Sequence, residues 1–136
     1  MKTFLGLGSN LGDKRQNIDY AIRQISSKTG QVLRQSTFYE SEPQGFQSEN
    51  QFVNAVVLLE TDLQPLALLH QLQEIEKEMG RLHKSKDGVY ADRIIDIDIL
   101  LYEDQIIDLP ELKVPHPHMK ERDFVMKPLN EILGLM

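Results

Sequence analysis

Two acidic residues interrupt a strongly apolar segment in the second half of the chain, and this feature restricts the possible folds most. Residues 94–102 read Ile-Ile-Asp-Ile-Asp-Ile-Leu-Leu-Tyr, which is typical of a β-strand. Because side chains alternate along a strand, the apolar residues at positions 95, 97, 99 and 101 are expected on one face. Asp96 and Asp98 then share the other face with Ile94 and Leu100. The fold must therefore bury one face of this strand and compensate two like charges on the other.

The periodicities along the rest of the chain predict the order strand, helix, strand, strand, helix, strand. Strands are expected over residues 2–8, 31–41, 52–60 and 94–102, helices from Asp13 to Gly30 and from Asp62 to Gly80, and an amphipathic segment over 124–133. The polar segments 42–51 and 81–93 are expected to be loops. This order predicts an α+β protein of the ferredoxin-like α/β sandwich type, an antiparallel sheet with helices packed on one face.

Length and composition exclude several classes of protein. The chain has 136 residues, no cysteine and a formal net charge of −6. This length predicts one domain over residues 1–136, and the lack of cysteine excludes disulfide scaffolds and thiolate zinc sites. The negative charge argues against nonspecific nucleic-acid binding. No apolar run is long enough to span a membrane and no secretory signal is evident, so we expect a cytoplasmic protein with no membrane partner. We also expect a monomer.

The two aspartates predict a site for divalent metal ions. Two residue rises of about 3.3 Å place their Cα atoms roughly 6.6 Å apart, and like charges at that spacing need compensation. Mg²⁺ prefers carboxylate oxygens together with substrate phosphates, so two Mg²⁺ ions on one polyphosphate would satisfy both Asp96 and Asp98. The alternative is a polar strand face that only contacts solvent, which the apolar neighbours Ile94 and Leu100 disfavour.

Two further features suggest a binding site near this strand. Glu76 falls within the apolar stripe of the second helix, so it either lines a polar site or reaches solvent from the edge of the stripe. Residues 81–93 carry four basic and two acidic side chains, although the whole chain is acidic. Basic residues beside a carboxylate pair suit a magnesium–polyphosphate site, because Arg and Lys hold phosphate oxygens. A solvated charged loop is the alternative.

Three weaker patterns leave more than one interpretation open. His116 and His118 form a His-x-His pair without an evident third zinc ligand, so contact of His116 with a phosphate or a base is favoured over a zinc site. The glycines of residues 6–12 match neither a dinucleotide fingerprint nor a P-loop, and they predict only a turn. Phe52 and Asn54 share a strand face, which suits a flat heterocycle, with core packing of Phe52 as the alternative.

Taken in order, these residues resemble the 6-hydroxymethyl-7,8-dihydropterin pyrophosphokinase family of folate biosynthesis. The matching segments span nearly the whole chain: Gly8-Ser-Asn-Leu-Gly12, Phe52-Val-Asn-Ala55, Glu76 with Gly80-Arg81, Arg93 to Tyr102, and Val114-Pro-His116 with Arg122-Asp-Phe124. The resemblance implies a ferredoxin-like fold and a Mg²⁺-dependent transfer of diphosphate from ATP to the pterin hydroxymethyl group, with release of AMP. ATP and the dihydropterin would then be its small-molecule partners.

The resemblance also implies roles for individual residues. The catalytic residues would be Arg81, Arg93, Asp96 and Asp98, with Asp96 and Asp98 binding two Mg²⁺ ions. The nucleotide would be bound by Gln73, Glu76, Lys84, Tyr90, His116 and Arg122. The pterin would be bound by Ser41, Gly45, Phe52, Asn54 and Phe124, with the two phenylalanine rings on either side of the heterocycle.

The sequence departs from the family pattern at several places. Ala91-Asp92 stands where the family commonly has Gly-Pro, His83 stands where a second arginine is usual, and Pro117 replaces an aromatic residue. These departures affect the segment expected to reach the phosphates and the expected adenine contacts. The competing interpretation is a noncatalytic module, such as an RNA-binding ferredoxin-like domain, but the paired aromatics of an RNA-recognition motif are missing.

Overall fold

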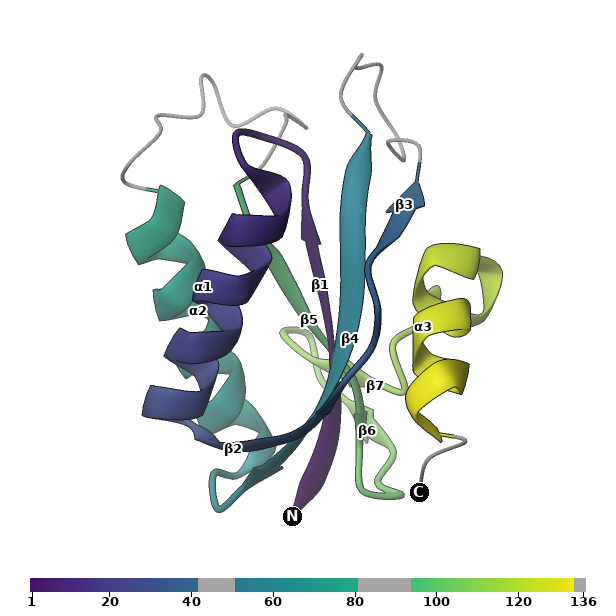
Figure 1. Ribbon diagram of the computed structural model, residues 1–136. Coiled ribbons are helices and arrows are strands. Elements are labelled where there is room, and N and C mark those ends of the chain that lie inside the picture. The colour runs from purple at the N-terminus through teal and green to yellow at the C-terminus, as the bar shows by residue number, and fades with distance from the viewer. Residues whose placement is uncertain (42–50, 81–93, 134–136) are drawn as a thin grey trace.

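The computed structural model describes residues 1–41, 51–80 and 94–133. Its centre is a five-stranded antiparallel sheet in the order β2-β4-β1-β5, with the short strand β3 also paired with β4 (Figure 1). The strands are β1 (Lys2–Ser9), β2 (Gly30–Gln35), β3 (Tyr39–Ser41), β4 (Phe52–Thr61) and β5 (Asp96–Tyr102). The predicted ferredoxin-like fold is thereby confirmed. The loops predicted over 42–51 and 81–93 lie outside the described residues, except for Gln51.

Three α-helices of the described residues cover the sheet, and they lie on both of its faces. Helices α1 (Lys14–Lys28) and α2 (Pro65–Gly80) pack side by side on one face, whereas α3 (Asp123–Leu133) packs on the opposite face (Figure 1). The sequence-based expectation that the helices lie on one face is therefore correct for α1 and α2 and wrong for α3. The starts and ends of α1 and α2 agree with the predicted ones to within about three residues, and the Asp13 side chain caps α1 by accepting a hydrogen bond from the Gln16 backbone N–H.

Each face of the sheet has its own apolar core. The first core lies under α1 and α2 and contains Leu5, Leu7, Ile18, Ile25, Val57, Leu59, Leu72, Ile75, Ile97 and Ile99, among others. The second core lies under α3 and is smaller, with Phe4, Val56, Leu58, Leu100, Met119, Val125, Leu129 and Ile132. The two central strands β1 and β4 contribute to both cores, because their alternate side chains face opposite helices.

A β-bulge changes which face two residues of β5 occupy. Leu5 of β1 pairs with Ile99, but the preceding residue Phe4 pairs with Leu101, so Leu100 is an extra residue in the ladder. Leu100 and Leu101 therefore both face α3, and the expectation that Leu101 lies with the isoleucines is wrong. Ile94 precedes the strand and packs in the core under α1 and α2, so its expected place beside the aspartates is also wrong.

The expected strand over residues 31–41 is divided by Ser36. The buried Ser36 pairs with Val56 through one backbone and one side-chain hydrogen bond. The Ser36 N–H donates to the Val56 carbonyl, and the Val56 N–H donates to the Ser36 hydroxyl at 2.9 Å. Residues 36–38 therefore separate β2 from β3 without leaving the sheet edge. The sequence also gave no indication of three short elements: β6 (Ile107–Asp108), β7 (Lys113–Val114) and the 3₁₀ helix η1 (Met119–Glu121). No described helix is long and apolar enough to cross a membrane.

Candidate active site

A row of residues across the sheet brings together several of the predicted site residues. On the face that α3 covers only in part, Gly8 of β1 pairs with Asp96 of β5 on one side and with Asn54 of β4 on the other. Gly6, two residues earlier, pairs with Asp98. Glycine has no side chain, so neighbouring side chains come close to the β1 backbone here: those of Asn54 and Phe52 at Gly8, and that of Leu100 at Gly6. This part of the sheet is the upper end in Figure 1, near the start of α3.

Gly8 occupies a position where any larger residue would meet the side chains of Asn54 and Phe52. A Cβ atom at Gly8 would lie 3.1 Å from Asn54 Oδ1 and 3.4 Å from Phe52 Cδ1. The Asn54 side chain is itself fixed, because its Nδ2 donates to the Tyr39 carbonyl at 3.1 Å and to Ser41 Oγ at 2.8 Å. Asn54 Oδ1 therefore points to the space above Gly8. The sequence pattern predicted only a turn at these glycines and missed this role of Gly8.

Glu76 joins the two aspartates in one acidic cluster. Its Oε2 accepts a hydrogen bond of 2.9 Å from the backbone N–H of Ile97, between Asp96 and Asp98. Burial, together with the charges of the two aspartates, raises the pKa of Glu76 to about 8, although the hydrogen bond from Ile97 acts in the opposite direction. Of the two alternatives for Glu76, the structure supports the one in which it lines a polar site.

His116 and Arg122 lie next to this cluster, in the segment between β7 and α3. The His116 backbone N–H donates to the Leu100 carbonyl at 3.0 Å, and its Nδ1 accepts from the His118 N–H at 3.2 Å. Burial lowers the pKa of His116, and the positive charge of Arg122 lowers it further. A neutral His116 with Nδ1 accepting carries its proton on Nε2, which is then a hydrogen-bond donor.

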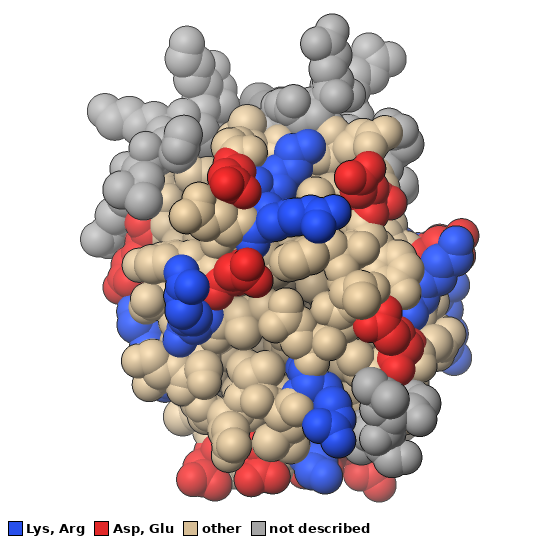
Figure 2. All heavy atoms as spheres, in the orientation of Figure 1, with Lys and Arg blue, Asp and Glu red and all other residues tan. Residues whose placement is uncertain are grey.

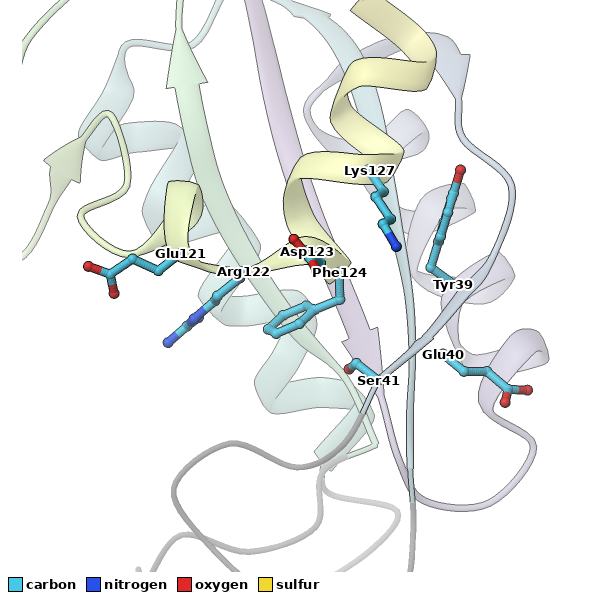
Figure 3. A pocket seen from close by; sticks show the side chains of 8 residues that line it. All are labelled: Tyr39, Glu40, Ser41, Glu121, Arg122, Asp123, Phe124 and Lys127. Carbon is cyan, nitrogen blue, oxygen red and sulfur yellow. The ribbon is translucent and has the colours of Figure 1, made fainter.

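Arg122 and Phe124 form one wall of a hollow of about 500 Å³ (Figure 3). The Arg122 guanidinium lies 5.7 Å from the centre of the Phe124 ring, a distance typical of a cation–π contact. The opposite wall is β3, which includes Ser41. The residues that line the hollow are Tyr39, Glu40, Ser41, Glu121, Arg122, Asp123, Phe124 and Lys127.

Three of the eight residues around this hollow, Ser41, Arg122 and Phe124, were predicted from the sequence. Tyr39 and Lys127 were not, although both have a detectable signal. Tyr39 stands two residues before Ser41 on the same strand, so their side chains share a face, and Lys127 follows Phe124 by about one helical turn. In Figure 3 the Lys127 side chain extends from α3 toward β3.

The remaining predicted site residues either lie apart from this row or fall outside the described residues. Gln73 is exposed on α2, one turn before Glu76. Gly45, Arg81, Lys84, Tyr90 and Arg93 lie outside the described residues, as do the departures at His83 and Ala91-Asp92. Phe52 packs beside Gly8 and Phe124 beside Arg122, so the sandwich of the two rings around a heterocycle stays a prediction.

The charges of the described residues favour a local binding site over an extended one. In Figure 2 the Lys and Arg side chains alternate with Asp and Glu side chains over the visible face instead of forming one basic surface. Among the described residues no group of three or more His, Asp or Glu side chains could hold a metal ion. The His-x-His zinc site thus finds no third ligand there.

Comparison with known proteins gives consistent results over almost the full chain. Residues 4–134 match the family described as 7,8-dihydro-6-hydroxymethylpterin-pyrophosphokinase. A 2-amino-4-hydroxy-6-hydroxymethyldihydropteridine pyrophosphokinase from Porphyromonas gingivalis is 48% identical over 130 residues, which cover 95% of this chain and 88% of the relative. The enzyme of the same name from Aquifex aeolicus is 44% identical, with 95% and 78% covered.

A solved structure shares the fold. The wild-type HPPK-DHPS chain of Plasmodium falciparum superimposes with a TM-score of 0.70 at 17% sequence identity. The superposition covers 95% of this chain and 40% of that longer chain. At this identity the likeness extends to the fold alone.

Proposed function

The chain belongs to the 7,8-dihydro-6-hydroxymethylpterin-pyrophosphokinase family, and from this premise we propose how its residues carry out the reaction. The reaction transfers the pyrophosphoryl group of ATP to the hydroxymethyl group of 6-hydroxymethyl-7,8-dihydropterin, a step of folate biosynthesis, and leaves AMP. The observation that carries the proposal is the row Asp96, Gly8, Asn54. In this row a carboxylate, which suits a metal ion, and an amide, which suits the heterocycle, lie on two sides of one residue without a side chain.

The acidic side of this row suits Mg²⁺. Asp96 and Asp98 share one strand face and supply hard carboxylate oxygens, and Mg²⁺ commonly uses one or two carboxylates and completes its shell with substrate phosphates and water. We propose that both aspartates hold two Mg²⁺ ions on the ATP phosphates. When bound, these ions would neutralise the phosphate charge that develops during transfer.

The residues next to the acidic cluster suit the nucleotide. The neutral His116 offers Nε2–H as a hydrogen-bond donor. Arg122 supplies a permanently charged guanidinium group whose N–H groups can donate to a phosphate oxygen. Glu76 accepts a hydrogen bond from the Ile97 N–H and thereby holds the part of β5 that carries the two aspartates. We propose that His116 and Arg122 bind the ATP, and that Arg81, Lys84, Tyr90 and Arg93 assist from the segment outside the described residues.

The amide side of the row suits the pterin. Asn54 Oδ1 points over Gly8, where it would accept a hydrogen bond from the amino group of the heterocycle. The Phe52 ring borders the same space and offers an aromatic surface to a flat ring system. We propose that Asn54 and Phe52, with Ser41 and Phe124 at the neighbouring wall, bind the dihydropterin with its hydroxymethyl group toward the aspartates.

The decisive experiment identifies the nucleotide product. Purified protein is incubated with ATP, Mg²⁺ and 6-hydroxymethyl-7,8-dihydropterin, and the nucleotides are separated and quantified. We expect one AMP for each pterin diphosphate, and no AMP when the pterin or Mg²⁺ is left out. ADP as the product would contradict pyrophosphoryl transfer, and AMP formation in the presence of a chelator would contradict the proposed metal requirement.

A further inference from the structure

A glutamate in the last turns of α3 makes three hydrogen bonds to the segment that precedes and begins β3. Glu131 Oε2 accepts from the Thr37 backbone N–H at 2.7 Å, and Oε1 accepts from Thr37 Oγ1 at 2.7 Å and from the Tyr39 hydroxyl at 2.9 Å. We call these three residues, Glu131, Thr37 and Tyr39, the Glu131 clamp. The hydrogen bonds from Thr37 and Tyr39 hold the pKa of Glu131 below its usual value, so the carboxylate is charged at neutral pH.

The second apolar core does not fix the position of β3 relative to α3. That core joins α3 to β1, β4 and β5 through residues such as Phe4, Val56 and Leu100, and it contains no residue of β3. Strand β3 is three residues long and pairs only with β4 among the described strands. The Glu131 clamp is therefore a direct polar link between α3 and the segment that continues into β3.

The Glu131 clamp and the hollow both lie between α3 and β3. Glu131 follows Phe124 by seven residues, close to two helical turns, so both side chains lie on the same side of α3. On the strand, Tyr39 and Ser41 share a face, and Figure 3 shows Tyr39, Ser41 and Phe124 around the same hollow. A link between Glu131 and Tyr39 therefore sets the separation of Ser41 from Phe124.

The clamp also reaches the amide proposed to bind the pterin. Asn54 Nδ2 donates to the Tyr39 carbonyl and to Ser41 Oγ, so the position of β3 decides where Asn54 Oδ1 points. We propose that Glu131 is a positioning residue for the pterin, which holds β3 against α3 and so orients Ser41, Asn54 and Phe124 without contacting the substrate. This inference rests on the proposed function.

Three variants and one control test the proposal. Glu131→Ala removes the whole clamp, Glu131→Gln keeps one oxygen acceptor, and Tyr39→Phe removes a single hydroxyl. The control is Glu78→Ala, which removes an exposed ion pair of 2.9 Å between Glu78 on α2 and Lys28 on α1, on the other face of the sheet. For each protein we would measure KM for the pterin, kcat, the Kd of a nonhydrolysable ATP analogue with Mg²⁺, and the melting temperature.

We expect a selective loss of pterin affinity. Glu131→Ala should raise KM for the pterin about tenfold, and Tyr39→Phe about threefold, in line with the usual net contribution of such hydrogen bonds. Glu131→Gln should lie between wild type and Glu131→Ala, kcat should stay within about twofold, and the Kd of the ATP analogue should not change. Glu78→Ala should leave all kinetic constants unchanged.

Two results would overturn the proposal. One is an unchanged KM for the pterin in folded Glu131→Ala. The other is an equal loss of pterin and nucleotide binding that follows the melting temperature in all variants, which is the signature of a purely structural role. If Glu131→Ala does not fold, Tyr39→Phe alone decides the question by the same split. Wild-type protein that forms no AMP would refute the proposed function. If the wild-type protein is active and the variants have the same KM for the pterin as wild type, only the positioning role is refuted.

Discussion

The two faces of the sheet are built from the same strands and yet differ in how completely they are covered. Under α1 and α2, β1 presents Leu5 and Leu7 to the larger core, and the buried Ser9 follows, its hydroxyl accepting a hydrogen bond from Asn17 Nδ2 of α1. Under α3, the same strand presents Phe4, then Gly6 beneath the Leu100 side chain, and then Gly8 between Asn54 and Asp96. One face is a closed core, whereas the other is an apolar core at one end and a polar row at the other.

This difference shows that alternate residues of one strand serve different purposes: those on one face stabilise the fold, and those on the other face are available for binding. Along β5, Ile97 and Ile99 face the closed core, and Asp96 and Asp98 face the open surface. Because the sides are separated by the strand itself, a change on one side should leave the other nearly intact. Substitutions on each side of the strand test this separation.

The largest effect should follow from removing an acidic residue of the open face. Asp98→Ala should reduce kcat at least about 1,000-fold, because it removes a proposed ligand of the metal on the polyphosphate. The melting temperature should stay constant or rise, because Asp98 repels Glu76 and Asp96 in the metal-free protein. Steady-state assays with saturating Mg²⁺ and a thermal melt measure both. Asp104→Ala, in the exposed turn after β5, is the matched control, and near-normal turnover of Asp98→Ala would break the assignment.

A change on the closed face should have the opposite character. Leu5 is fully buried and pairs with Val57 and Ile99, so Leu5→Ala should lower the free energy of unfolding by about 3 kcal/mol. At a temperature well below the melting transition, kcat should remain within about twofold. Urea denaturation and the same assay test the two statements together. Leu109→Ala, at a partly exposed leucine, is the control, and a large drop in kcat with intact folding would show that the faces are coupled.

The pH dependence of stability should report on Glu76. Its pKa is raised from 4.5 to about 8, so between these values the folded protein binds more protons than the unfolded chain. The free energy of unfolding of the metal-free protein should therefore fall as the pH rises, by about 2 kcal/mol between pH 6 and pH 8. Glu76→Gln should flatten this slope, which urea denaturation at several pH values in the presence of a chelator would show. An equal slope in both proteins would mean that another group causes it.

The smallest effect should come from adding a side chain at Gly8, between the two sides of the row. Gly8→Ala places a methyl group 3.1 Å from Asn54 Oδ1, so the amide must shift by a few tenths of an ångström. We expect the Kd for the pterin to rise about tenfold, with nearly unchanged stability. Gly80→Ala is the matched control, since a Cβ there meets nothing within 4 Å. Calorimetric titration decides, and equal pterin affinity in Gly8→Ala would show that the space above Gly8 is not used.

Local patterns predicted the parts of the fold that depend on local physics. Helices α1 and α2 and strand β4 follow from periodicity and end signals, and the alternation around Ile97 placed the two aspartates on one face. The bulge at Leu100 was not predictable, because it depends on the register with β1 and not on the sequence of β5 alone. The side of the sheet on which α3 packs was missed for a similar reason: it depends on how the chain crosses the edge of the sheet.

In the candidate site, too, features that depend on the local sequence were predictable and tertiary contacts were not. The acidic pair and Glu76 stood out because charged residues occupy positions that an apolar pattern would fill. Glu76 accepts a hydrogen bond from the backbone N–H of Ile97, which follows it by 21 residues in the sequence. No residue type signals such a contact, because every residue except proline has a backbone N–H. The hollow lined by Tyr39 on one side and Lys127 on the other needs the pairing of β3 with β4 and the placement of α3, both of which are tertiary features.

The hydrogen bond between Glu76 and Ile97 has a consequence for encounters between molecules. Strand β5 ends the described sheet, and an outer strand normally offers free N–H and C=O groups that can template a strand of another chain. Here the carboxyl group of Glu76 on α2 accepts one of these N–H groups, that of Ile97, and Asp96 and Asp98 lie on either side of Ile97. A second copy that paired with this edge would have to displace the carboxyl group and place its own backbone next to the two aspartates. We therefore expect the acidic cluster to disfavour edge-to-edge aggregation.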